Sequence, residues 1–262
     1  MRIQIEKDQL GWVAGLLDSC GNIMFSKTHV SGNIEIKLKL TDYECLENMK
    51  TKYGGAVKVS RTGTRYRLNH SEGLKKLLED INGQIRIPVR VKKVKEVCEK
   101  NNIEIKYPDK ELSLDTAWLS GFFDGVGSIV INQTTLENKK QLVLTFNQKN
   151  NQILIKIQRI VGGNFYINTN TQSGKYKYAL YFTSKEEILQ LYEYFKKYPS
   201  RAYKNKRIGL IPQYYELQTL MTSIHDNQLQ ETLWKKFMIQ WDYKEIDEIQ
   251  SGEILKQKGV IR

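Results

Sequence analysis

"WVAGLLDSCG" at residues 12–21 and "WLSGFFDGVG" at residues 118–127 are nearly the same phrase. Aligning the two copies pairs Gly15 with Gly121, a separation of 106 residues (121 − 15). A later glycine doublet repeats at nearly the same separation, 108 residues (162 − 54). The chain therefore contains an internal duplication, and each copy opens with the same short apolar stretch, which is typical of a helix.

The residues after each phrase predict the same order of elements twice. "NIEIKLKL" at residues 33–40 alternates strictly, with Glu35, Lys37 and Lys39 opposite the apolar positions, which is typical of a half-buried strand. Helices are predicted over residues 42–53 and 71–81, with Asp42 and Ser71 as caps. Each unit is expected to be α-β-β-α-β-β-α. The fold class is α+β, with two pseudo-symmetric units, each a four-stranded antiparallel sheet with helices on one face, and sheets that form a saddle-like trough.

The domain boundary is expected near Pro108, in a segment without periodicity. Residues 1–107 form the first unit, and residues 108–262 form the second unit with C-terminal helices and a basic tail. One chain thus forms a monomeric pseudo-dimer.

The charge balance indicates an anionic partner. The chain has 41 Lys and Arg against 29 Asp and Glu, a net charge of +12, and such an excess favours binding to nucleic acid. No apolar run approaches the length of about 20 residues that spans a membrane. Three cysteines without metal-ligand spacing argue against disulfides and against a zinc site. The 31 Lys against 10 Arg, with 26 Ile and 17 Asn, suggest an AT-rich genome, and we expect an organellar protein encoded in a mitochondrion or chloroplast.

The polar faces of the predicted strands carry side chains that reach phosphates and base edges. In the first unit the candidates for nucleic-acid contact are Lys37, Lys39, Lys58, Arg61, Arg65 and Arg67. In the second unit they are Gln141, Asn147, Asn164, Asn168 and Lys177. A solvated sheet face is the alternative, and the repetition over two units on a basic protein favours the interface.

The paired phrases resemble the two motifs of the single-chain LAGLIDADG homing endonucleases and their group I intron maturase relatives, and the resemblance covers roughly residues 8 to 225. It implies that the two motif helices pack on each other through small residues. On this chain the helix-interface positions are Ala14, Gly15, Asp18, Ser120, Gly121 and Asp124.

The resemblance also locates a loss. In the family the eighth motif residue is an acid that holds a divalent metal, and here those positions are Cys20 and Val126. A thiol is too soft for Mg²⁺, and a valine offers no ligand. Asp18 and Asp124 stand two residues earlier, about 200° around the helix, and are expected to brace the helix junction instead. The chain is therefore expected to have no catalytic residues, no metal and no cofactor.

Two basic segments resemble those that follow the last helix of each family unit. Their candidate phosphate contacts are Arg86, Arg90, Lys92 and Lys93 in the first, and Lys204, Lys206 and Arg207 in the second. A solvated helix face is the alternative for each residue singly.

Two functions stay open. One is an inactive member that binds folded RNA in preference to duplex DNA, as an intron maturase or a structural component of a ribonucleoprotein such as a ribosome, alongside other proteins. The other is a site-specific DNA endonuclease with an atypical active site, which alone would need Mg²⁺.

Overall fold

A computed structural model describes residues 2–24, 32–60, 63–133, 140–167 and 178–242 of the chain, with side chains from residue 10 onward. The binding candidates Arg61, Asn168 and Lys177 lie outside the described residues, and so does the basic tail after Asp242.

The first unit has its strands and helices in the predicted order. Its elements are α1 (Arg2–Cys20), β1 (Asn22–Met24), β2 (Asn33–Leu38), the short 3-10 helix η1 (Leu40–Asp42), α2 (Tyr43–Tyr53), β3 (Ala56–Ser60), β4 (Gly63–Leu68), α3 (Ser71–Ile81) and α4 (Pro88–Lys100).

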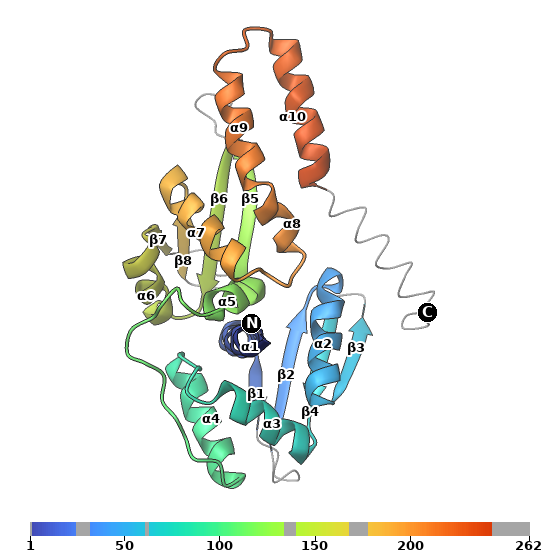
Figure 1. The fold of residues 1–262 in the computed structure, drawn as a ribbon, viewed down its shortest axis with the longest axis vertical. Helices are drawn as coiled ribbons and strands as arrows, with labels where there is room; N and C mark the ends of the chain where they lie inside the picture. The colour runs from blue at the N-terminus through green and yellow to red at the C-terminus, as the bar shows by residue number, and fades with distance from the viewer. Residues whose placement is uncertain (1, 25–31, 61–62, 134–139, 168–177, 243–262) are drawn as a thin grey trace.

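The second unit repeats this order and extends it. Its elements are α5 (Trp118–Val126), β5 (Gly127–Gln133), β6 (Lys140–Gln148), α6 (Gln152–Val161), β7 (Asn164–Ile167), β8 (Tyr178–Phe182), α7 (Lys185–Lys197), α8 (Lys204–Gly209), α9 (Ile211–Met221) and α10 (Asn227–Trp241). The hairpin of α9 and α10 projects from the second unit, away from the first (Figure 1).

The two sheets share one topology. The strand orders are β1-β2-β4-β3 and β5-β6-β8-β7, and every neighbouring pair is antiparallel. The predicted α+β class with two four-stranded antiparallel sheets is therefore confirmed. No helix among the described residues is long and apolar enough to cross a membrane.

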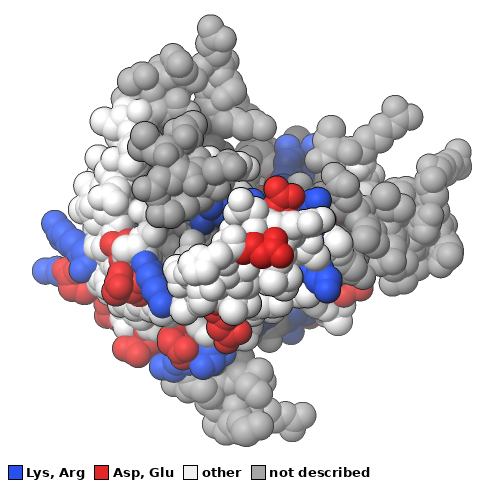
Figure 2. Space-filling model, turned by 90° about the horizontal axis from the view of Figure 1, so that it is seen from above, with Lys and Arg blue, Asp and Glu red and all other residues white. Residues whose placement is uncertain are grey.

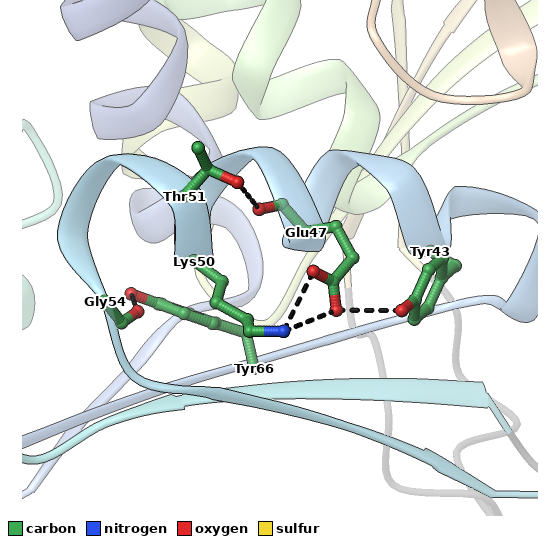
Figure 3. Close-up of polar contacts among 6 residues, drawn as sticks. All are labelled: Tyr43, Glu47, Lys50, Thr51, Gly54 and Tyr66. Atoms are coloured by element: carbon green, nitrogen blue, oxygen red, sulfur yellow. Dashed lines mark hydrogen bonds and ion pairs between the residues drawn. The ribbon is translucent and has the colours of Figure 1, made fainter. Parts of the chain in front are cut away.

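Helix α2 is fixed to the first sheet at its C-terminal end. The hydroxyl of Tyr66 on β4 donates to the carbonyl of Gly54, 2.8 Å away, just after the helix (Figure 3). On the solvent side of α2, Glu47 accepts from Tyr43 and from Lys50 at 2.8 and 3.1 Å. Such exposed pairs contribute little to stability, so the buried apolar face holds the helix in place.

Three local expectations are corrected. Strand β2 ends at Leu38, so Lys39 is exposed beyond the strand rather than on its face. Helix α3 is capped by His70, whose Nδ1 accepts from the backbone of Gly73, and not by Ser71. Asp42 occupies the N-cap position of α2, but its carboxylate makes no bond to the helix.

The two units meet through α1 and α5, which lie side by side between the two sheets (Figure 1). A Cβ atom on Gly15 would lie 1.9 Å from the carbonyl oxygen of Trp118, and one on Gly121 would lie 1.9 Å from that of Trp12. Both distances are far inside van der Waals contact, so only glycine permits this backbone approach. Ala14 and Ser120 are also fully buried here.

Between the units, the segment from residue 103 to residue 115 contains neither helix nor strand. The boundary placed near Pro108 falls within it. The segment is tied to the first unit, because the Nδ2 of Asn82 donates to the carbonyl of Glu104 at 2.7 Å.

We expect Gly15→Ala to destabilise the protein by about 3 kcal/mol or more, because the added methyl group meets backbone that cannot rotate away. Gly209→Ala in α8 is the matched control, since nothing lies within 4 Å of its added Cβ. Alanine there should be neutral or stabilising by up to about 1 kcal/mol. Urea unfolding measures both changes, and equal midpoints for the two variants would contradict the close helix contact.

Candidate nucleic-acid interface

Two reciprocal hydrogen bonds join the motif helices. The indole of Trp12 donates to Asp124 at 2.8 Å, and the indole of Trp118 donates to Asp18 at 3.0 Å. All four side chains are buried, at 2% exposure or less. Each unit thus supplies a donor to the carboxylate of the other, as pseudo-twofold symmetry requires.

Both carboxylates also hold the segment that follows the last helix of their own repeat. Asp18 accepts from the backbone N–H groups of Arg86 and Ile87 at 2.7 and 3.1 Å. Asp124 accepts from the backbone of Arg201 at 2.8 Å and from the hydroxyl of Ser200. Asp18 and Asp124 therefore anchor the helix junction and the chain beside it.

Burial dominates the titration of these acids. It raises the pKa of Asp18 to about 7, although the hydrogen bonds from Arg86, Ile87 and Trp118 lower it. Burial likewise raises the pKa of Asp124, against the charge of Lys204 and the hydrogen bond from Ser200. The hydrogen bonds that these carboxylates accept all come from groups within the fold, so neither is placed as a metal ligand.

The C-terminal ends of the motif helices touch. Gly125 lies so close to the other helix that a Cβ atom there would meet the Ser19 hydroxyl at 1.8 Å and the Cys20 sulfur at 3.1 Å. The Cys20 thiol donates to the carbonyl of Leu16 at 3.4 Å, and burial raises its pKa to about 11. A thiol this far from ionisation is a poor metal ligand, because the thiolate is the form that binds metal.

A lysine lies at the end of α5. The ammonium group of Lys204 donates to the carbonyls of Phe123 and Asp124, both at 2.8 Å. Burial lowers its pKa, and the charges of Asp124 and Asp42 counter this. A cation is favourable here because the C-terminal end of a helix carries partial negative charge.

Arg90 occupies the corresponding position in the first unit. Along the chain, Arg90 follows Arg86 by four residues (90 − 86), and Asp18 accepts from the backbone of Arg86. Lys204 likewise follows Ser200 by four residues (204 − 200), and Asp124 accepts from the hydroxyl of Ser200. Burial lowers the pKa of Arg90, while Asp18 and Cys20 act on it from the end of α1. Both helix ends thus have a partly buried basic side chain beside them.

The residues at this centre do not fit the divalent metal that the family motif implies. The two aligned positions offer a neutral thiol and the buried, apolar Val126. The two backbone carbonyls at the end of α5 already accept hydrogen bonds from the ammonium group of Lys204. Among the described residues, no three His, Cys, Asp or Glu side chains form a group that could hold a metal ion.

The outer face of the first sheet, the one turned away from α2 and α3, is cationic. Lys37 pairs across the strands with Arg65, and Arg65 pairs with Lys58, so three basic residues form one row. Arg67 stands two residues further along β4. Lys58, Arg65 and Arg67 line a depression of about 250 Å³, together with Ala56 and Asn69.

Glu35 organises this cationic face. Its carboxylate lies 3.0 Å from Arg67, 3.2 Å from Lys37 and 3.8 Å from Arg65. Partial burial raises its pKa, but the hydrogen bond from Arg67 and the charges of Lys37 and Arg65 outweigh this, and the net shift is downward. Four cations against this one carboxylate leave the face positive, while Glu35 restrains the basic side chains.

The outer face of the second sheet differs, because its described residues include no Lys, Arg, Asp or Glu. The strand pairing places on this face Ser128, Val130, Asn132, Gln141, Val143, Thr145, Asn147, Asn164, Tyr166, Ala179 and Tyr181. The binding candidates Gln141, Asn147 and Asn164 are thus brought together here, as Lys37, Lys58, Arg65 and Arg67 are on the first sheet.

Two other candidates have internal partners. The Arg86 guanidinium donates to the carbonyls of Asp109 and Glu111 at 3.2 and 3.0 Å, and so holds the segment between the units. Arg207 donates to the carbonyls of Trp241 and Ile129, both at 3.1 Å. These contacts favour a structural role for both arginines over the predicted contact with phosphate.

The remaining basic candidates lie on helix surfaces. Lys92 on α4 and Lys206 on α8 are exposed, and Lys93 is half-buried. On the end of the molecule seen in Figure 2, acidic and basic side chains are intermingled rather than gathered into a patch of one sign. The cationic row on the first sheet therefore differs from the described residues seen at this end of the molecule.

Sequence reasoning missed a second tie between the units. Asp42 accepts from the backbone N–H of Tyr203 at 2.7 Å, and the Cys45 thiol donates to the carbonyl of Arg201 at 2.7 Å. Periodicity contains no signal for this contact, because Asp42 has the spacing of an ordinary helix cap. The start of α2 thus holds the segment that presents Lys204.

Comparisons with known proteins agree with this geometry. A family model described as "LAGLIDADG endonuclease" matches residues 119–215. The chain is 37% identical over 247 residues to the intron-encoded DNA endonuclease ai2a of Dictyostelium discoideum, covering 93% of this chain and 78% of that protein. It is 34% identical over 237 residues to the intron-encoded RNA maturase bI4 of Saccharomyces cerevisiae, covering 88% of this chain but only 36% of that protein.

A solved structure shares the fold. The LAGLIDADG meganuclease I-AabMI, crystallised bound to uncleaved DNA, superposes with a TM-score of 0.66 at 15% identity, covering 88% of this chain and 97% of that one. The chain belongs to the LAGLIDADG family of intron-encoded endonucleases and maturases, in its single-chain form with two motifs.

We expect Trp118→Phe to destabilise the protein by about 1–3 kcal/mol, because it removes a donor from a buried carboxylate. Trp234→Phe is the control, since this half-buried indole packs on the ring of Tyr214 and not on a buried carboxylate. Chemical unfolding compares the two variants. A loss for Trp118→Phe no greater than that of the control would argue against the reciprocal bonds as the main tie between the units.

Proposed function

We propose that this protein is a LAGLIDADG member that binds nucleic acid without cutting it, and that its partner is a folded RNA. The observation that carries the proposal is the contrast between Asp18 and Cys20 on one helix. The acid that braces the fold is present with all its hydrogen bonds, whereas the position two residues later has a neutral thiol. The same contrast recurs between Asp124 and Val126.

The proposed absence of cleavage follows from the kinds of side chain at the helix ends, which offer no metal ligand. Metal-assisted hydrolysis of a phosphodiester needs hard oxygen ligands to hold the metal that activates water. A sulfur, a methyl-bearing side chain and the ammonium of Lys204 supply none. Drift without selection would damage the helix contact as readily as the metal positions, yet Gly15 and Gly121 are retained. Selection for the fold without the chemistry accounts for both.

The binding surface proposed for the nucleic acid is the pair of outer sheet faces. The cationic row of Lys37, Arg65 and Lys58 suits a phosphate backbone, and the net charge of +12 draws an anion to it. The neutral face of the second sheet presents amides and hydroxyls, which suit base edges or 2′-hydroxyl groups.

RNA is favoured over duplex DNA because a relative that aligns with 88% of this chain is named as an RNA maturase. The exposed lysines of α4 extend the basic surface beyond the sheets, where a folded RNA, but not a duplex in the trough, would meet them. As a maturase or ribonucleoprotein component the protein would work in the organelle that encodes it, alongside other proteins. The second candidate function is DNA cleavage, which the name of the Dictyostelium relative favours.

We expect the purified protein to leave every DNA duplex that it binds uncut in the presence of Mg²⁺ or Mn²⁺. Supercoiled plasmid carrying a bound target measures nicking and linearisation together. The double variant Cys20→Asp, Val126→Asp is the matched comparison, since it alone restores two oxygen ligands. Linear product from the unchanged protein at enzyme-like rates would establish the endonuclease instead.

We expect Lys37→Glu to weaken RNA binding about tenfold or more, because it removes a phosphate contact and adds repulsion. The logarithm of the affinity should fall with the logarithm of salt concentration, by about 0.7 to 0.9 per phosphate contacted. Lys50→Glu is the control, since Lys50 is exposed on α2, on the other side of the first sheet. Filter binding measures both variants. A flat salt response, or crosslinking in cells to DNA alone, would remove the RNA assignment.

A further inference from the structure

The outer faces of the two sheets differ in kind, although their topologies are the same. Among the described residues, the first face has four cations and one carboxylate, and the second has no ionisable group other than the tyrosine hydroxyls. The described part of the second sheet therefore offers the nucleic acid neutral contacts rather than charged ones.

An exposed aromatic pair lies on this neutral face. Tyr166 on β7, an edge strand of the second sheet, is 58% exposed. Its ring centroid lies 4.8 Å from that of Tyr181 on β8, with an angle of 73° between the planes. This edge contact covers one side of the Tyr166 ring and leaves most of the residue open to solvent.

Neutral hydrogen-bonding groups surround the pair. Asn164 lies directly across the strands from Tyr181, and Asn147 and Thr145 follow on β6, with the Asn147 amide 3.5 Å from the Thr145 hydroxyl. Amide side chains offer donors and acceptors to base edges, and a tyrosine ring offers a stacking surface. Every base has a π-face, but in a duplex the faces are covered by neighbouring pairs.

We propose that the second sheet binds unpaired nucleobases, with one base stacked on Tyr166 and its edge read by the amides of Asn147 and Asn164. The first sheet then binds the phosphates of the adjoining segment. This inference rests on the proposed function and specifies it, because it assigns the second sheet to a loop, bulge or single strand rather than to a continuous duplex.

A fluorescent base analogue tests the stacking. The probe is an RNA hairpin with 2-aminopurine at one position of its loop, and the comparison is a fully paired RNA duplex of equal length. Stacking on Tyr166 should quench the loop fluorophore when the protein binds. Tyr166→Ala should abolish the quenching and lower the affinity for the hairpin about tenfold, with less than a twofold effect on the duplex. Tyr166→Phe should keep both properties.

Tyr107→Ala is the matched control, because Tyr107 is 62% exposed but lies in the segment between the units. A deoxyribonucleotide hairpin of the same sequence distinguishes the source of the unpaired base, and equal quenching there would extend the site to single-stranded DNA. Quenching that persists in Tyr166→Ala, or equal affinity for hairpin and duplex, would overturn the inference while the effect of Lys37→Glu upheld the proposed function. If neither probe binds in a salt-dependent way, both fail.

Discussion

Two carboxylates buried between two helices are the constraint on which the rest of the structure depends. A buried carboxylate is costly unless donors surround it. Asp18 and Asp124 each accept the indole N–H of the opposite unit; Asp18 also accepts two backbone N–H groups of its own unit, and Asp124 accepts one backbone N–H and the Ser200 hydroxyl. Removing one partner of such a group leaves the other unsatisfied in a medium of low dielectric, so the set is retained or lost together. The close backbone contact at Gly15 and Gly121 brings the helices near enough for the indoles to reach.

The same helices separate the bracing residues from the motif positions that align with the family's metal-binding acids. Two residues beyond each bracing carboxylate stand Cys20, whose thiol donates to the carbonyl of Leu16, and the buried Val126. Under the proposed function, Lys204 and Arg90 beside the helix ends would supply the positive charge that attracts a phosphate. A protein-borne cation attracts a phosphate but does not activate water for cleavage.

The sequence predicted the duplication and the order of helices and strands along the chain, because spacing and periodicity determine both, and it displayed the motif positions without acids directly. It did not predict which basic residues point outward: Arg86 and Lys93 stand in one run, yet only Arg86 bonds the carbonyls of Asp109 and Glu111. Contacts between distant segments, such as Asp42 with Tyr203, leave no periodic signal. The sequence also did not predict that Glu35 pairs with the basic side chains of the first sheet. Alternation identifies the face of a strand but not the ion pairs made with a neighbouring strand.

The reciprocal bonds also bear on how the chain is made. Trp12 and Asp124 are 112 residues apart, so α1 leaves the ribosome long before α5 exists to cover it. Until then the indole of Trp12 lacks its partner Asp124, and the face of α1 that packs on α5 has no cover. Contacts of such long range slow folding and lengthen the time during which apolar surface is open to aggregation. In a single-chain pseudo-dimer the contact between the two motif helices thus forms only after the second half of the repeat has been made.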